Sequence, residues 1–154
     1  DEFSARLREH MPDSMGLTTG ADAIASALNQ FKVKNISVVS PYQPIGDEQV
    51  LKFFTETGFN VKHNIGLRCD TANSIAHTPQ KDVLNLIVNE MDGDDVDAIV
   101  QVGTNMSNSD LFPTIEKMLD KPVIPINVAT IWHALRAIGV TDQFVGKGWL
   151  MERH

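Results

Sequence analysis

The sequence predicts an α/β fold, a three-layer sandwich in which a four-stranded parallel sheet lies between two layers of helices. Short β-branched segments alternate four times with longer segments of helical periodicity. Three of the short segments are largely apolar, which is typical of strands buried on both faces, whereas Phe59–Ile65 alternates between apolar and polar residues. Strands that alternate with helices pair in parallel, because the crossover helices cover both faces of the sheet. We therefore expect a flavodoxin-like arrangement.

The predicted strands are short segments rich in apolar and β-branched residues. The first one ends before Pro41, because proline lacks the N–H group that a central strand needs. The four predicted strands are Ile36–Val39, Phe59–Ile65, Ala98–Val102 and Val123–Ile126.

The predicted helices show apolar residues at every third or fourth position and suitable residues at their ends. Thr18 or Thr19 caps the first core helix, Gly58 closes the second, and Pro79 opens the third. The predicted core helices are Gly20–Phe31, Asp47–Thr57, Gln80–Met91, Ser109–Leu119 and Ala129–Ile138. A short N-terminal helix is predicted from the spacing of Phe3, Leu7 and Met11.

The composition is that of an ordinary globular domain, with 154 residues, 42% of them hydrophobic, and a formal charge of −7. This charge and the lack of a basic stripe argue against a nucleic-acid partner. No apolar segment approaches the roughly 18 residues of a membrane span, and no secretion signal is visible. The single cysteine, Cys69, excludes an intrachain disulfide and fits a reducing compartment, so we expect a cytoplasmic protein.

Four loops are candidates for a binding site, because ligands of an open parallel sheet bind beyond the carboxyl ends of its strands. All four loops are rich in Ser, Thr, Asn or Tyr, and the second is predicted to be long and irregular. They are Ser40–Gly46, Gly66–Thr78, Gly103–Asn108 and Asn127–Thr130. No metal-ligand spacing occurs among them, so we expect no metal site, and none of them is a P-loop or a GxGxxG loop.

The third loop gives the strongest signal. A buried strand ends at Gly103, and Thr104, Asn105, Ser107 and Asn108 lead into a predicted helix. Backbone N–H groups at such a helix start point at one spot, which suits a carboxylate or a phosphate. The same junction is common in α/β folds, so alone it indicates only a generic anion site.

The first two loops offer side chains with suitable chemistry. Ser40 and Tyr42 can donate hydrogen bonds to a carboxylate, and the phenol can also give up a proton; the alternative is a turn with a half-buried tyrosine. Asn73 can hydrogen-bond a substrate. Cys69 is a nucleophile only if a neighbour lowers its pKa, and a lone loop cysteine is more often inert.

Four segments together resemble the maleate isomerase and arylmalonate decarboxylase group of the aspartate/glutamate racemase superfamily. They are SPY after the first strand, Asn73 in the second loop, VGTNMS after the third strand, and NVATIWHALRAIGV near the end. Members of this group have two similar α/β halves that clamp the substrate, and each half usually offers one cysteine. The resemblance implies that this chain is the C-terminal half of a two-domain racemase-like fold and belongs to a longer protein.

The resemblance also implies a division of the chain. Residues 1–33 are expected to be linking helices, 34–126 the α/β domain, and 127–154 a C-terminal helix and tail that pack against the missing N-terminal half. The apolar residues of the last helix, Ile131, Leu135 and Ile138, would face that half. Without it we expect self-association, and we expect the native protein to be a homo-oligomer.

The function implied by the resemblance is cofactor-independent isomerisation of a small dicarboxylate, most simply maleate to fumarate. Tyr42 matches the active-site tyrosine of the group, Asn73 its substrate-binding asparagine, and Thr104 and Asn105 its backbone donors. Gly103 falls where the second half's cysteine stands, and Cys69 matches no family cysteine. The alternatives are a non-catalytic carboxylate-binding relative, or a decarboxylase or racemase. The chain alone offers one wall of the site, so we expect it to be inactive.

Overall fold

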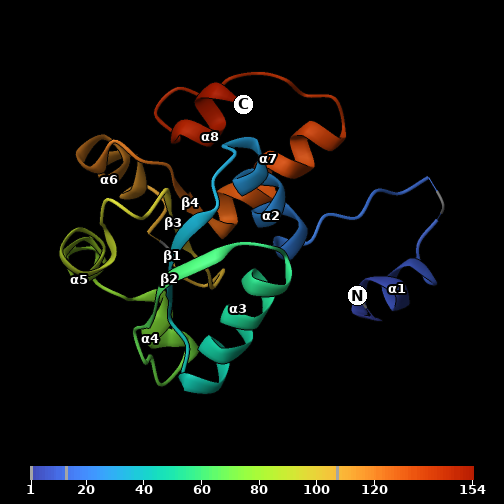
Figure 1. The fold of residues 1–154 in the computed structure, drawn as a ribbon. Helices are drawn as coiled ribbons and strands as arrows, with labels where there is room; N and C mark the ends of the chain where they lie inside the picture. Colours follow the sequence, from blue (N-terminus) through green and yellow to red (C-terminus); the bar gives the residue numbers. More distant parts are fainter. Residues whose placement is uncertain (1, 13, 107) are drawn as a thin grey trace.

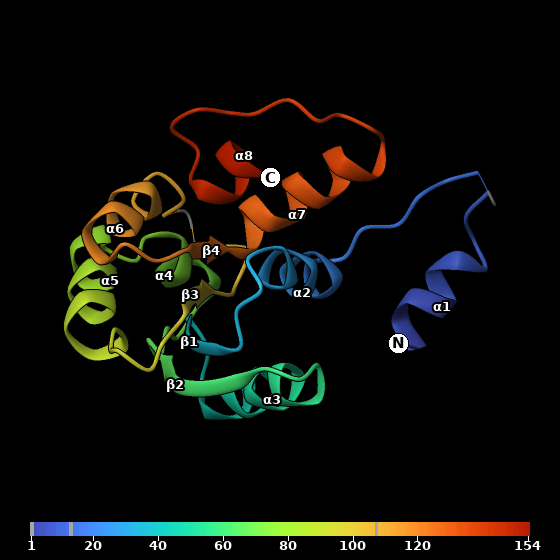
Figure 2. The ribbon, with the colours of Figure 1, turned by 45° about the horizontal axis from the view of Figure 1, so that its top comes forward.

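The computed structural model describes residues 2–12, 14–106 and 108–154, and only the backbone of Glu2 and Phe3. Ser107, one of the predicted loop residues, therefore lies outside the described residues. The structure confirms the predicted α/β fold (Figures 1 and 2). Four parallel strands pair in the order β2-β1-β3-β4. They are β1 (Asn35–Ser40), β2 (Asn60–Gly66), β3 (Ala98–Gln101) and β4 (Val123–Pro125).

Helices cover both faces of this sheet, and α1 lies apart from it at the end of an extended segment (Figures 1 and 2). In chain order the helices are α1 (Glu2–Arg8), α2 (Gly20–Gln30), α3 (Pro44–Glu56), α4 (Ala72–Ala76), α5 (Gln80–Leu86), its π-helical continuation η1 (Ile87–Met91), α6 (Phe112–Leu119), α7 (Ile126–Ala137) and α8 (Trp149–Arg153). Within the described parts of the chain, no helix is long and apolar enough to cross a membrane.

The core consists of two apolar clusters, one on each face of the sheet. Alternate strand residues serve alternate clusters, as the period of a β-strand requires. On β1, Val38 joins the cluster formed with α2, α3, α7 and α8, whereas Val39 joins the one formed with α5, η1 and α6. Both side chains are fully buried, which explains why β1 reads as a largely apolar segment.

Several predicted boundaries are wrong, and local chemistry explains two of the differences. Helix α3 begins at Pro44 instead of Asp47, because proline fits the first turn of a helix. Helix α6 begins at Phe112 instead of Ser109. The loop predicted as irregular contains α4, which starts at a capping box between Thr71 and Ser74. Helix α8 was not predicted at all.

The register of the sheet brings the first and third loops together. Val39 of β1 pairs with Gln101 of β3, and the N–H group of Val102 donates to the carbonyl of Val39 at 3.0 Å. The residues that follow these strands, Pro41 and Gly103, therefore leave the sheet side by side.

Candidate active site

The two loops that leave β1 and β3 flank the point where the sheet reverses its strand order. The helix after β1, α3, packs on one face, and the helix after β3, α6, packs on the other. In open α/β sheets, ligands bind in the crevice that forms between two such diverging connections. The fold therefore selects the region around Tyr42 and Gly103.

Gly103 is buried and lies against the first loop. Its φ of +94° is in the left-handed region that side chains rarely adopt. A Cβ atom at this position would lie 2.5 Å from Cδ of Pro41 and 3.7 Å from the phenolic oxygen of Tyr42. The backbone is thus shaped for glycine, and the Tyr42 hydroxyl points to the place where a side chain would begin.

Tyr42 is half-buried, and its ring forms part of the wall of a cavity of about 330 Å³ between α2 and α3. Phe53, Val102 and Ile126 also line this cavity, so its surface is largely apolar. Burial raises the pKa of the Tyr42 hydroxyl above its ordinary value of 10.0. The phenol is therefore protonated at neutral pH and can act as a hydrogen-bond or proton donor.

The segment after Gly103 is a turn, as predicted, but the following helix, α6, begins at Phe112 instead of Ser109, so the turn does not lie at a helix start. The N–H group of Met106 closes the turn on the carbonyl of Gly103 at 3.1 Å. The Gln101 amide donates to the carbonyls of Val102 and Gly103, at 2.6 and 3.0 Å. The Asn127 amide holds the carbonyl of Thr104 at 2.9 Å. These contacts fix the orientation of the peptide groups that an anion would meet.

The third loop also contacts the second. The Asn105 amide donates to the carbonyl of Ala72 at 2.5 Å, which ties the turn to the first residue of α4. Asn73 is the second residue of α4 and is exposed. The predicted substrate-binding residues Asn73, Thr104 and Asn105 are thus brought to one edge of the sheet, although the Asn105 amide is engaged within the protein.

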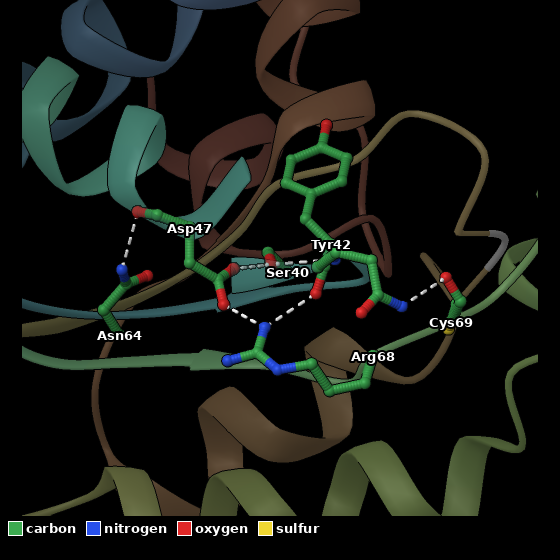
Figure 3. A network of polar contacts seen from close by, with 7 residues as sticks. Ser40, Tyr42, Asp47, Asn64, Arg68 and Cys69 are labelled. Atoms are coloured by element: carbon green, nitrogen blue, oxygen red, sulfur yellow. Dashed lines mark hydrogen bonds and ion pairs between the residues drawn. The ribbon is translucent and has the colours of Figure 1, made fainter. Parts of the chain in front are cut away.

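Ser40 has a different place from the one expected of a substrate ligand. Its hydroxyl is fully buried, donates to Asp47 at 2.5 Å, and accepts the N–H group of Tyr42 at 3.0 Å (Figure 3). These partners occupy Ser40 inside the protein, so its role is to support the first loop.

Asp47 and Arg68 form an ion pair that the sequence did not suggest as part of the site (Figure 3). They lie 21 residues apart on α3 and in the second loop, and no spacing pattern links them. Arg68 has a φ of +57°, which is uncommon for a residue with a side chain. This backbone conformation was the one feature that could have drawn attention to it, and it is visible only in the structure.

Cys69 does not face the phenol. Its sulfur lies 3.7 Å from the hydroxyl oxygen of Thr78, and its carbonyl accepts a hydrogen bond from the Gln43 amide at 3.2 Å. The ring of Tyr42 points away from it (Figure 3). The position of the thiol gives no support to nucleophilic attack by Cys69 in the crevice beside Gly103.

The fold and this arrangement define a class of protein, the parallel α/β proteins with a polar site at the carboxyl edge of the sheet. The comparison with protein families identifies the family to which the chain belongs. The family model described as arylmalonate decarboxylase matches residues 1–151, and the chain belongs to this family.

Named relatives and solved structures agree with that assignment. A maleate isomerase of Pseudomonas putida is 30% identical over 151 residues, covering 95% of this chain and 60% of that protein. The crystal structure of a maleate isomerase from P. putida S16 with maleate, a cysteine-to-alanine variant, is 28% identical. It superposes with a TM-score of 0.82 over 86% of this chain and 53% of that one.

A double mutant of arylmalonate decarboxylase in a liganded form shows the same fold. Its TM-score is 0.87 at 23% identity, over all of this chain and 67% of that one. The racemase-like fold predicted from the sequence is thereby confirmed. The chain spans little more than half the length of the maleate isomerases that it matches.

Proposed function

We propose that this chain is the C-terminal domain of a cofactor-independent isomerase of small dicarboxylates, with maleate as the simplest substrate. The observation that carries the proposal is the position of the Tyr42 phenol, 3.7 Å from where a Gly103 side chain would begin. The resemblance places a cysteine of the family at Gly103. A protonated phenol beside that place can supply the proton that a second thiol would supply in a two-cysteine site.

In the proposed reaction, a thiolate from the N-terminal half adds to one alkene carbon of maleate. A C–S bond forms, and the π electrons move to the neighbouring carbon and its carboxylate as an enediolate. Tyr42 protonates that carbon, and the former double bond, now single, rotates. The phenolate then takes the proton back, the C=C bond re-forms in the trans geometry, and the C–S bond breaks to release fumarate and the thiolate.

The turn of residues 103–106 has a binding role in this proposal. The N–H groups of residues 103–105 would bind a substrate carboxylate and stabilise the enediolate charge, as oxyanion holes do. The N–H group of Met106 already donates to the carbonyl of Gly103. The contacts of Gln101 and Asn127 with the carbonyls of the turn support this role, because they hold the peptide groups in place before substrate arrives. Asn73 would hold the second carboxylate.

A second candidate is a carboxylate-binding relative that has lost catalysis. Gly103 favours it, because a left-handed glycine packed against Pro41 leaves this wall of the site without a thiol. Binding of a dicarboxylate without turnover would be its signature.

The experiment that separates the candidates uses the full-length protein. Calorimetric titration with maleate, fumarate and substituted malonates measures binding, and fumarate formation and CO₂ release measure turnover. Conversion of maleate to fumarate without an added metal or cofactor supports the isomerase. Tight binding with neither reaction supports the non-catalytic relative, and release of CO₂ from a malonate assigns a decarboxylase instead.

We also propose that α7 packs against the N-terminal half. Its side chains Ile131 and Ile138 are 57% and 76% exposed, and Ile131 lines an apolar groove together with Leu135 and Phe144. Such exposed side chains are typical of a contact surface. In the isolated chain this surface is expected to drive self-association, which sedimentation velocity measures. A strictly monomeric profile at high concentration would contradict this. We further propose that the full-length protein is a homo-oligomer in the cytoplasm.

A further inference from the structure

A single carboxylate, that of Asp47, holds both backbone polar groups of Tyr42 through two intermediates. The N–H group of Tyr42 donates to Ser40 Oγ at 3.0 Å, and Ser40 in turn donates to Asp47 Oδ1 at 2.5 Å. The carbonyl of Tyr42 accepts Arg68 Nη1 at 2.8 Å, and the same nitrogen contacts Asp47 Oδ2. The four residues form a closed ring of hydrogen bonds around the tyrosine backbone (Figure 3).

This ring of hydrogen bonds is built around a buried carboxylate. Asp47 is only 6% exposed, and a buried carboxylate needs a cationic partner to offset its lost hydration. Glycine at position 66 makes room for this partner, because a Cβ atom there would overlap Arg68 and Asp47 and lie 2.7 Å from the carbonyl of Tyr42. Arg68 has a left-handed backbone conformation, and its guanidinium forms an ion pair with Asp47. Such strain persists only where the surroundings stabilise it.

Further contacts join the first loop to the second and to α3. The N–H group of Leu67 donates to the carbonyl of Ser40 at 2.8 Å, and that of Cys69 donates to the carbonyl of Pro41 at 3.0 Å. A Cβ atom at Gly46 would lie 2.7 Å from Cβ of Tyr42, so glycine lets the first turn of α3 lie against the tyrosine side chain. The direction of the phenol is therefore set by the ion pair, the loops and the helix together.

We infer that Asp47 and Arg68 are positioning residues of the site, which hold the Tyr42 phenol beside Gly103 and leave substrate binding to other groups. The inference rests on the proposed function insofar as it concerns turnover. A misplacement of a reacting group by about 1 Å can cost on the order of 100-fold in rate. Loss of the ion pair is therefore expected to lower kcat and to change KM little.

The test compares two ion pairs of the full-length protein. Arg68→Met removes the guanidinium next to Tyr42. Arg68→Lys keeps a positive charge but lacks the guanidinium that contacts both the carbonyl of Tyr42 and Asp47. The matched control is Lys121→Met, which removes the partly buried contact of Lys121 with Asp92 at 2.6 Å, outside the site. Each methionine variant loses one ion pair and is expected to be less stable. A fall in kcat that occurs only in Arg68→Met therefore reports the positioning of Tyr42 and not a general loss of stability.

Tyr42→Phe serves as the reference for a second, non-kinetic readout. The difference in absorbance near 295 nm between proteins with and without this substitution follows the ionisation of the Tyr42 phenol alone. In the intact protein the phenol titrates above its ordinary pKa of 10.0 because it is half-buried. In Arg68→Met the freed ring is expected to become more exposed, and the pKa to fall back towards 10.0.

The expected result is a fall in kcat of at least 10-fold in Arg68→Met, partial rescue in Arg68→Lys, a change in KM below threefold, and the lower phenol pKa. Lys121→Met is expected to keep kcat within twofold. Equal kcat values for the two methionine variants together with an unchanged phenol pKa would overturn the inference. If Tyr42→Phe itself leaves turnover unchanged, the proposed function fails, and the phenol titration still decides whether Asp47 and Arg68 position the ring.

Discussion

The phenolic oxygen of Tyr42 lies 3.7 Å from the position that a Cβ atom on Gly103 would occupy. The two residues are 61 positions apart in the chain, and the parallel pairing of β1 with β3 brings them together. Tyr42 contributes a protonated phenol, and Gly103 contributes a backbone without a side chain, packed against Pro41. The proposed proton transfer by Tyr42 depends on this proximity.

Gly103→Ala is expected to destabilise the protein by about 3 kcal/mol, because the new methyl group meets both the left-handed backbone and the ring of Pro41. Gly58→Ala is the matched control. Gly58 has nearly the same φ, +89°, but open space around it, so only the backbone cost of about 1 kcal/mol applies. Urea unfolding measures both values. Equal losses would show that Pro41 yields without cost and that a side chain fits at position 103.

Cys69→Ala is expected to keep turnover of the full-length protein within twofold. The sulfur lies beside Thr78, and the Tyr42 ring points away from it. Steady-state kinetics with maleate measure this directly. A loss of two orders of magnitude or more would identify Cys69 as the nucleophile and reverse the assignment made here.

Asn105→Ala is expected to weaken dicarboxylate binding about fivefold, because the amide no longer fixes the start of α4 and with it Asn73. Asn89→Ala is the control, since the Asn89 amide also donates to a backbone carbonyl, that of Asn85, but on the α5–η1 segment away from the site. Calorimetric titration gives both dissociation constants. Unchanged affinity in Asn105→Ala would remove the link between the turn and α4 from the binding account.

The buried carboxyl group of Glu116 is expected to make the stability of the fold depend on pH. It is 1% exposed and accepts the N–H groups of Val123 and Trp149, and burial raises its pKa from 4.5 to about 7. The folded state thus holds the proton more tightly than the unfolded state. The stabilisation that protonated Glu116 gives to the folded state is fully present below pH 4.5. As the pH rises to about 7, the free energy of unfolding falls by about 3 kcal/mol.

Urea unfolding between pH 4.5 and 8 measures this loss. Glu116→Gln, which cannot ionise, is expected to flatten the fall in stability over this range. Glu56→Gln is the control, because it removes an exposed carboxylate on α3 that is not among the groups acting on the pKa of Glu116. The same pH slope in the original protein and in Glu116→Gln would contradict the assignment.

The sequence predicted those parts of the structure that depend on local pattern. Strands β1, β3 and β4 read as largely apolar segments because both of their faces are buried, whereas the partly exposed β2 shows an alternating pattern. The switch-point rule brought Tyr42 and Gly103 to one crevice. Helix boundaries shifted by a few residues where proline decided the first turn, as at Pro44.

The support of the site could not be predicted in the same way. Asp47 and Arg68 come from different elements, and nothing in either segment indicates that they meet. Ser40 illustrates the same limit, since its hydroxyl is suited equally to a substrate and to the buried carboxylate that it contacts. Which partner a polar side chain takes depends on tertiary packing, and local pattern does not encode it.

The most direct test of the central claim is the turnover of maleate by the full-length protein with Tyr42→Phe. This substitution keeps the ring that lines the cavity and removes only the proton donor. If the phenol delivers the proton, kcat falls by about 100-fold or more while the dissociation constant for maleate changes little. If kcat is unchanged, Tyr42 is not the donor, and the account of this site is wrong.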